Sequence, residues 1–366
     1  MNRVRLVAAI LLVHAVAGPS VQAASIRAPE VLTIEGGEHT FTQPLVVPPG
    51  ATLVIRNATI YLDAPKVCPA RGSFEFCVPQ LFVMPGGTLV AENTTFDTHD
   101  PTGLYRGYRI YAHAGVLSIT DSRILRANVV GGEEPGPAPS RIERSFFAEG
   151  VQTISFTRGM DAHVVGNRIE RSTGGIDIRD SAVSTIRDNS IQVSGNGIDV
   201  QATSVGDKAL PTRVLVEGNT VTGGLVGFFT LNSYGSTVRR NVFRGNRFGA
   251  ILGVFTGDYS RGREDILFEE NLLEDNEYAI NAYTAISGGA RERYDIVVPV
   301  RRNSVLRTAC HSVWADPTGH ANVSLTIDAR ENWWGSPEGP QDGVEPGCSA
   351  VAGPALVSPW LTAPPD

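Results

Sequence analysis

The chain has 366 residues, of which 42% are hydrophobic, 31 are basic and 38 are acidic, so its formal net charge at pH 7 is −7. This acidic balance argues against nucleic acid as a partner, because phosphate binding needs a basic face. The 39 glycines, the 23 prolines and the lack of a long 3.6-residue period favour an all-β protein over a helical one.

The N-terminus predicts an export signal over residues 1–23. Two arginines precede an apolar run, LVAAILLVHAVAG (residues 6–18), and small residues end at Ala23, where a signal peptidase would cut. The run is shorter than the ~20 apolar residues of a membrane span, and an uncleaved anchor is the alternative. The mature chain, with 29 basic and 38 acidic residues and a net charge of −9, is expected to be secreted or periplasmic, monomeric and not inserted in a membrane.

An internal repeat starts in the first third of the chain. The segments PGATLVI, PGGTLVA and HAGVLSI are in step, and five residues after each leucine comes a small residue followed by an apolar one. These small residues are Ala58, Thr94 and Ser122, and Ser145 continues the series.

Asparagine then fills the same position of the repeat. It occurs in VVGNRI, IRDNSI, VEGNTV, VRRNVF, FEENLL, VRRNSV and DARENWW, at Asn167, Asn189, Asn219, Asn241, Asn271, Asn303 and Asn332. The steps are 22, 30, 22, 30, 32 and 29 residues. A minimum near 22 with additions of 8 to 10 is typical of a coil that accepts loops in some turns and must stack on its neighbours.

This ladder, V-x-x-N-x-I followed by G-I-x-V, resembles the right-handed parallel β-helix of pectate-lyase-like proteins, from about residue 40 to 335. The ending NWWGSPEGP (332–340) with VSPWL (357–361) is similar to the C-terminal closing segment of many exported members. We therefore expect an all-β, single-stranded right-handed parallel β-helix of about eleven coils over residues 24–332. A capping segment should follow over 333–366, with Trp333, Trp334 and Trp360 packing in it.

The asparagines are expected to be structural. A turn asparagine can adopt the left-handed conformation and bond the adjacent backbone, and stacked asparagines can bond one another along the coil.

Strand alternation assigns an outer face to the coil. In GIDIR, Ile176 and Ile178 point inward, so Asp177 and Arg179 point outward. One outward column lies ten residues after each ladder residue and reads Ser155, Asp177, Asp199, Phe229, Ile251 and Asn281, then Trp314 if the coil at 303 has one extra residue. A second lies twelve residues after and reads Thr157, Arg179, Gln201, Leu231, Gly253, Tyr283 and Asp316. Apolar side chains on an outer face indicate a ligand groove, a partner surface or a region covered by loops.

The longer coils carry their extra residues just after the strand that bears these outward columns, at about 203–212, 255–265, 284–295 and 316–322. These segments are predicted either to form a wall along one side of a groove or to fold back over the aromatic side chains.

Asp177 and Asp199 are predicted to lie on neighbouring rungs, ~4.8 Å apart. Their repulsion should be compensated by Arg179, a bound cation or a shared proton. The pair fits a structural use, a calcium or sugar site, or catalysis together with Arg179. As outward residues, both are expected to tolerate substitution by asparagine with little change in stability.

The sequence departs from the enzymes that it resembles. It has no Asp-Asp pair and no Gly-His-Gly of polygalacturonases, and no strand has the several-aspartate calcium cluster of typical pectate lyases. No histidine pattern supports a metal site. We therefore expect no cofactor or metal, apart from possible calcium at Asp177 and Asp199.

The leading function is the binding of a polysaccharide or cell-surface glycan in a groove on this face. The expected contacts are Phe229, Tyr283, Trp314, Gln201 and Asn281, because aromatic faces stack on sugar rings and polar groups fix orientation. One alternative is a polysaccharide-cleaving lyase or glycoside hydrolase that uses Asp177, Asp199 and Arg179. Another is a passive surface or adhesion module.

The four cysteines are expected to form two disulfides, because export makes disulfides possible. Sequence alone permits three pairings. Cys68–Cys77 and Cys310–Cys348 are favoured, since the members of each pair are near in sequence and would pin a loop. No Cys-x-x-Cys supports a zinc site.

Mass mapping of the non-reduced protein should therefore link the peptide of Cys68 to that of Cys77, and the peptide of Cys310 to that of Cys348. A Cys68–Cys310 link would contradict both the pairing and the predicted separation of these residues by many coils.

Overall fold

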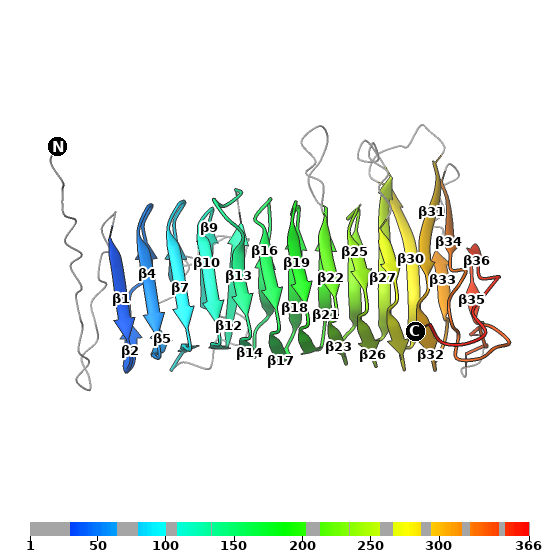
Figure 1. The fold of residues 1–366 in the computed structure, drawn as a ribbon, viewed down its shortest axis with the longest axis horizontal. Helices are drawn as coiled ribbons and strands as arrows, with labels where there is room; N and C mark the ends of the chain where they lie inside the picture. The colour runs from blue at the N-terminus through cyan, green and yellow to red at the C-terminus, as the bar shows by residue number, and fades with distance from the viewer. Residues whose placement is uncertain are drawn as a thin grey trace.

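The computed structural model describes residues 30–63, 80–99, 108–132, 134–202, 213–233, 235–256, 266–286, 294–316, 323–343 and 348–365. These residues form strands β1 to β36, arranged in three parallel sheets that run side by side along one long axis (Figure 1). The expected signal segment, Cys68 and Cys77 lie outside the described residues. No helix of the described residues is long and apolar enough to cross a membrane.

Sheet 1 has 13 strands. They are β1 (Val31–Glu35), β4 (Thr52–Arg56), β7 (Thr88–Glu92), β10 (Val116–Thr120), β13 (Ser140–Glu143), β16 (Ala162–Val165), β19 (Ser184–Arg187), β22 (Val214–Glu217), β25 (Thr237–Arg239), β28 (Leu267–Glu269), β31 (Tyr294–Arg301), β34 (Val323–Asp328) and β36 (Ala355–Leu356).

Sheet 2 has 11 strands. They are β2 (Glu38–Phe41), β5 (Thr59–Leu62), β8 (Thr95–Asp97), β11 (Arg123–Leu125), β14 (Phe146–Ala148), β17 (Arg168–Ser172), β20 (Ser190–Val193), β23 (Thr220–Thr222), β26 (Val242–Arg244), β29 (Leu272–Glu274) and β32 (Ser304–Leu306).

Sheet 3 has 12 strands. They are β3 (Leu45–Val47), β6 (Leu81–Val83), β9 (Tyr108–His113), β12 (Ala127–Gly132), β15 (Gln152–Phe156), β18 (Gly174–Arg179), β21 (Asn196–Gln201), β24 (Val226–Leu231), β27 (Phe248–Thr256), β30 (Tyr278–Ile286), β33 (Val313–Asp316) and β35 (Val351–Ala352).

The chain visits sheets 1, 2 and 3 in turn and returns to sheet 1 one coil further along the axis. Parallel pairing between successive coils, joined by crossovers of one hand, is the right-handed parallel β-helix that the sequence predicts. The number of about eleven coils stays a prediction, since the described residues form sheets of 13, 11 and 12 strands.

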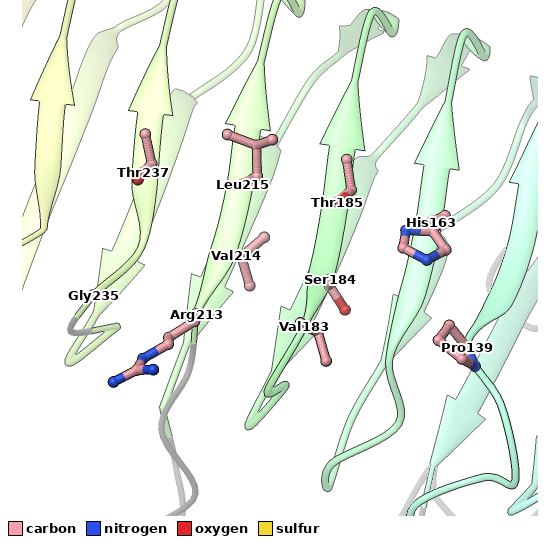
Figure 2. Close-up of a pocket in the computed structure, with 10 residues that line it drawn as sticks. All are labelled: Pro139, His163, Val183, Ser184, Thr185, Arg213, Val214, Leu215, Gly235 and Thr237. Carbon is pink, nitrogen blue, oxygen red and sulfur yellow. The ribbon is translucent and has the colours of Figure 1, made fainter.

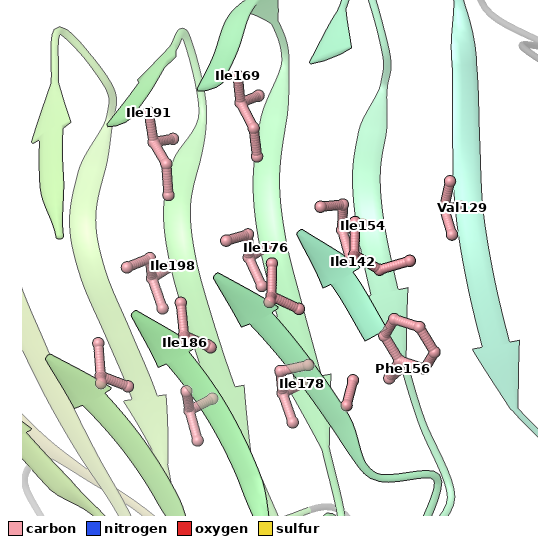
Figure 3. Close-up of a cluster of buried hydrophobic side chains, with 14 of the residues drawn as sticks. Val129, Ile142, Ile154, Phe156, Ile169, Ile176, Ile178, Ile186, Ile191 and Ile198 are labelled. Carbon is pink, nitrogen blue, oxygen red and sulfur yellow. The ribbon is translucent and has the colours of Figure 1, made fainter. Parts of the chain in front are cut away.

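A continuous apolar core fills the inside of the coil. Residues of one type stack in columns, and Ile154, Ile176 and Ile198 follow one another on β15, β18 and β21 (Figure 3). Where three phenylalanines meet, Phe228, Phe243 and Phe268 lie 6.1–6.3 Å apart between ring centroids. The small Ala250 follows the bulky Phe228 in the column on sheet 3, where the three rings already fill the interior.

The asparagine ladder runs along the turn between sheets 1 and 2. The backbone N–H and the side-chain Nδ2 of Asn189 both donate to Oδ1 of Asn219, at 3.0 and 2.9 Å. Asn189 Nδ2 also donates to the carbonyl of Val164 in the preceding coil at 2.8 Å. The same pattern links all seven asparagines from Asn167 to Asn332, and hydroxyls of Thr94, Ser122 and Ser145 occupy the earlier coils. The predicted hydrogen bonding along the coil is therefore confirmed.

The prediction of the left-handed conformation is wrong by one residue. Positive φ angles occur at the residue before each ladder asparagine, for example Asp188 (φ 54°) before Asn189 and Arg240 (φ 55°) before Asn241. The preceding residue makes the bend, which leaves the asparagine side chain pointing into the coil, where it is fully buried.

A second, shorter ladder was not predicted. Asn246 Oδ1 accepts from the backbone of Gly224, and both nitrogens of Asn246 donate to Oδ1 of Asn276, at 3.0 Å from the backbone and 3.3 Å from Nδ2. These asparagines follow the main ladder by five residues, in the turn between sheets 2 and 3. The repeated spacing in NVFRGN and NLLEDN was the available signal.

The C-terminal segment continues the stack. In the described residues β35 pairs with β33, β36 pairs with β34, and a disulfide joins Cys310 to Cys348, as predicted. Trp334 is buried in the core and Trp360 packs against it, while Trp333 forms a parallel bridge with Ser304.

The ladder makes a stability prediction. Asn219→Ala should lower the free energy of unfolding by about 3 kcal/mol, because the change strands several buried backbone groups that Asn219 now satisfies. Urea unfolding monitored by circular dichroism measures the effect.

Thr220→Ala is the matched control, since Thr220 is the exposed neighbour on sheet 2. Equal midpoints for Asn219→Ala and Thr220→Ala would contradict a stabilising role for the ladder.

Candidate functional site on the outer face of sheet 3

The two predicted outward columns lie on the outer face of sheet 3. In the first column, pairing joins Ser155, Asp177, Asp199, Phe229, Ile251, Asn281 and Trp314 rung by rung. In the second it joins Arg179, Gln201, Leu231, Gly253, Tyr283 and Asp316. The extra residue expected in the coil at 303 is therefore present, because Trp314 pairs with Asn281.

Two glycines set the geometry of the carboxylate strands. A Cβ on Gly175 would lie 2.1 Å from the carbonyl oxygen of Gly197, and one on Gly197 would lie 2.1 Å from Cγ1 of Val221. The backbone can make this close approach only without side chains. The glycines in GGIDIRD and GNGIDVQ thus bring the two strands to the position where the next isoleucine enters the core and the next aspartate faces outward.

Asp177 is held by three neighbours. Arg179 Nε donates to Oδ1 at 2.9 Å, while Gln152 Nε2 and Ser155 Oγ donate to Oδ2. Burial raises the pKa of Asp177, and the charge of Arg179 opposes that rise. Of the three predicted ways to offset the charge of the pair, namely Arg179, a bound cation or a shared proton, Arg179 contacts Asp177 directly.

Asp199 lies on the next rung without a cation of its own in the described residues. Gln201 Nε2 donates to Oδ1 at 2.7 Å and Asn196 Nδ2 to Oδ2 at 3.4 Å. Burial, followed by the negative charge of Asp177, raises the pKa of Asp199 to about 7. One member of the pair thus has a proton to give near neutral pH, while the other has an arginine partner.

The expectation of two freely exposed carboxylates is wrong. Asp177 is 4% exposed and Asp199 is 9% exposed, although both lie on the outer face of the sheet. The side chains of Gln152, Arg179 and Gln201 lie against them, and alternation along a strand carries no information about such cover. Substitution at these positions will therefore change the stability more than a surface substitution does.

The C-terminal half of the face is apolar and aromatic. Phe229, Leu231, Ile251, Tyr283 and Trp314 are all partly exposed, and Asn281 is buried with its Nδ2 donating to the carbonyl of Trp314 at 3.1 Å. A Cβ on Gly253 would lie 3.0 Å from Cζ of Tyr283 and 2.9 Å from Leu231, so this glycine makes room for the tyrosine ring. Burial and the charge of Asp199 raise the pKa of Tyr283, which links the two halves of the face electrostatically.

Sequence reasoning missed a third column at the start of these strands. It places Asn196 beside the carboxylates and continues through Val226 and Phe248 to Tyr278. Phe248 stacks on Tyr278 at 4.9 Å, and Tyr278, His311 and Trp314 lie 5.4–5.9 Å apart between centroids. His311 donates from Nδ1 to the carbonyl of Ser349 at 2.6 Å. The sequence contained a signal for this column: an aromatic residue, Phe248 or Tyr278, lies two positions after each asparagine of the second ladder.

The predicted wall of loops stays a prediction, because most of the four insertions lie outside the described residues. β27 and β30 extend through Thr256 and Ile286, so the first residues of two insertions are strand.

A second concave region lies on sheet 1. A shallow groove of about 520 Å³ crosses β16, β19, β22 and β25 and reaches Pro139, just before β13 (Figure 2). It is lined by Pro139, His163, Val183, Ser184, Thr185, Arg213, Val214, Leu215, Gly235 and Thr237. Asp161 Oδ1 accepts from the backbone of Ala182 and Val183 at 3.0 Å, which fixes the turn that exposes Val183 at its edge. The groove faces away from the carboxylate pair and was not predicted.

Metal ligation finds little support in the described residues. In that part of the chain no group of three or more His, Cys, Asp or Glu side chains is placed to hold a metal ion. Calcium at Asp177 and Asp199 stays a prediction, and Arg179 already supplies a positive charge there.

Residues 138–289 match the family model described as periplasmic copper-binding protein (NosD). No curated protein matches the chain.

Three solved structures show the range of similarity. The mannuronan C-5 epimerase AlgE6 A-module of Azotobacter vinelandii has 14% identity and a TM-score of 0.52, with 92% of this chain and 91% of that chain covered. An exopolygalacturonase from Thermotoga maritima has 11% identity and a TM-score of 0.40, covering 83% and 79%. A periplasmic alginate epimerase, AlgG, has 12% identity and a TM-score of 0.49, covering 88% and 76%. The likeness to the A-module shows that the two chains share a fold.

The pKa of Asp199 predicts a pH-dependent effect of Asp199→Asn. The folded pKa is raised above the unfolded value, so the folded state is favoured fully at low pH and loses this advantage as the pH rises through about 7. At pH 8 the variant should be more stable than wild type, by up to about 4 kcal/mol, because the carboxyl must ionise while it is buried. At pH 4 the difference should disappear.

Asp188→Asn is the matched control, because Asp188 is an exposed aspartate in a turn next to sheet 1. Thermal unfolding of the three proteins between pH 4 and pH 8 measures the effect. A destabilised Asp199→Asn at pH 8, or a difference that does not depend on pH, would show that the carboxyl is ionised at little cost.

Proposed function

We propose that the protein binds a polysaccharide along the outer face of sheet 3. The proposal depends on one observation: polar and apolar side chains lie in one continuous strip on this face. Asp177 and Asp199, with their arginine and amide neighbours, lie in register with Phe229, Ile251 and Trp314. Sugar rings present both apolar faces and hydroxyl groups, and such a strip meets both needs.

The dimensions of the strip support an extended chain as the ligand. Asp177 and Trp314 are five rungs apart, a span of roughly 24 Å at the usual spacing of strands. A pyranose chain in an extended conformation advances by nearly one rung per sugar, so an oligosaccharide of about six units would cover the strip. A module of the same fold is named as a mannuronan epimerase, which agrees with a polysaccharide as the ligand class.

The proposed place of action is outside the cytoplasm, either secreted or periplasmic. The Cys310–Cys348 disulfide favours an oxidising compartment, and the family model that matches residues 138–289 is described as periplasmic. The predicted export signal agrees with both.

A second candidate function is acid–base chemistry on the bound chain by Asp177 and Asp199. The observation that favours it is the difference between the two carboxyls. Asp177 has an arginine partner, whereas Asp199 has a pKa raised to about 7 and can exchange a proton near neutral pH. Such a pair suits a lyase or a glycoside hydrolase, in which one group donates a proton and the other acts as base or nucleophile.

Trp314→Ala tests the binding proposal. It should weaken the binding of a hexasaccharide about three- to tenfold, because one aromatic–sugar contact is lost. Isothermal titration calorimetry against a glycan panel measures the affinity, and thermal unfolding checks that the variant is folded.

Phe146→Ala is the matched control, since Phe146 is a partly exposed aromatic residue on sheet 2, under the guanidinium of Arg123. Equal affinities for wild type and Trp314→Ala, or equal losses in both variants, would argue against the sheet 3 face. Product formation that disappears in both Asp177→Asn and Asp199→Asn would favour cleavage over binding alone.

A further inference from the structure

The charge balance of the sheet 3 face points to the class of glycan. Among the described residues near the carboxylate pair, the acidic groups are Asp177, Asp180 and Asp199, and the basic groups are Arg158 and Arg179. With all of them ionised, this part of the face carries a net negative charge.

The positive charge of Arg179 is already engaged. Its Nε lies 2.9 Å from Oδ1 of Asp177, and its side chain is only 35% exposed. The charges of Asp177, Asp199 and Asp180 together raise the pKa of Arg179. A carboxylate on an incoming sugar would compete with Asp177 for the charge of this guanidinium and would bring a further negative charge beside Asp177 and Asp199.

The other cation lies at the rim. Arg158 is exposed at the end of β15, in the position that Asp180 holds one coil later. Both have left-handed backbone conformations, with φ angles of 56° and 55°. Asp180 is buried and adds a negative charge near Arg179.

The negative potential extends toward the aromatic half. The charge of Asp199 contributes to the raised pKa of Tyr283, which lies three rungs further along. Between them Phe229, Leu231 and Ile251 carry no charge. The described part of this half thus offers apolar contact and no cation for an anionic sugar.

We infer that the ligand of the sheet 3 face is a neutral polysaccharide, with no carboxylate or sulfate on the units that cross β18 to β30. This inference rests on the proposed binding of a polysaccharide at the same face. It follows from the buried, arginine-paired Asp177, the adjacent Asp199 and the uncharged aromatic half. Neutral sugars can accept the available hydrogen bonds and stack on the rings without adding charge to an acidic strip.

The test compares neutral and acidic hexasaccharides of equal length by isothermal titration calorimetry at pH 8. The neutral probes are cellohexaose, mannohexaose and laminarihexaose, and the acidic probe is hexagalacturonic acid. The best neutral probe should bind at least about tenfold more tightly than the acidic one, because like charges this close repel strongly in a partly buried site. At pH 5, where Asp199 gains its proton, the ratio should fall.

The variant Asp199→Asn tests whether the repulsion of an acidic glycan comes from the carboxylate on the sheet 3 face or from the net charge of the whole protein. It should raise the affinity for hexagalacturonic acid at pH 8 by about tenfold, because it removes one negative charge at the strip. Asp188→Asn removes the same charge from a turn next to sheet 1 and should leave that affinity unchanged within about twofold at 0.15 M salt.

The outcomes distinguish the two proposals. Tighter binding of hexagalacturonic acid than of every neutral probe at pH 8 would overturn the neutral class and leave polysaccharide binding standing. An equal gain in Asp199→Asn and Asp188→Asn would also overturn it, since the repulsion would then not arise at the strip. If none of the four probes binds, both the proposed function and the inference fail.

Discussion

The buried asparagine ladder is the interaction on which the rest of the structure depends. At the turn between sheets 1 and 2 the chain must bend sharply while its backbone polar groups stay inside the protein, and such groups are costly to leave unpaired. Asn189 shows the solution. It accepts two hydrogen bonds from the coil before, donates two to the coil after from its backbone N–H and Nδ2, and satisfies a carbonyl of the preceding coil. Because each asparagine needs the next one at a fixed height, the ladder sets the register of every coil.

That register is what creates the site. Once coils cannot slip, residues about ten positions after the asparagine stack along the outer face of sheet 3, with one extra residue in the coil of Asn303. Asp177 and Asp199 become neighbours in this way, although a slip of one residue would turn them into the core. Close contact between the backbones at Gly175 and Gly197 then keeps the two strands tight. Arg179 pairs with Asp177, while Asn196 and Gln201 donate to Asp199.

Much of this arrangement was predictable from the sequence, for a physical reason. The ladder spacing, the two outward columns, the extra residue before Trp314 and the Cys310–Cys348 bridge all follow from one-dimensional repetition. The burial of Asp177 and Asp199 does not, because it depends on long side chains such as Gln152 that reach across from another coil. The left-handed residue was misplaced by one position for a related reason. Either residue of the Asp-Asn pair at 188–189 can adopt that conformation, and only the packing of the coil decides which one does.

The balance between apolar contact and charge gives this face its character. The outer face of sheet 3 joins partly exposed aromatic rings to two buried carboxyl groups, which suits an extended sugar chain. Because its arginine is paired with Asp177, the face is better suited to an uncharged sugar chain than to an acidic one. The groove on sheet 1 offers a contrasting surface, lined by aliphatic side chains together with His163 and Arg213. The two faces would therefore select different ligands.

The most direct measurement is a crystal structure of the protein with a neutral hexasaccharide that binds it. The account predicts sugar density along the outer face of sheet 3, from Asp177 past Phe229 to Trp314, with about one sugar ring per rung. Density confined to the groove on sheet 1, or a sheet 3 face left empty while the sugar binds elsewhere, would contradict it.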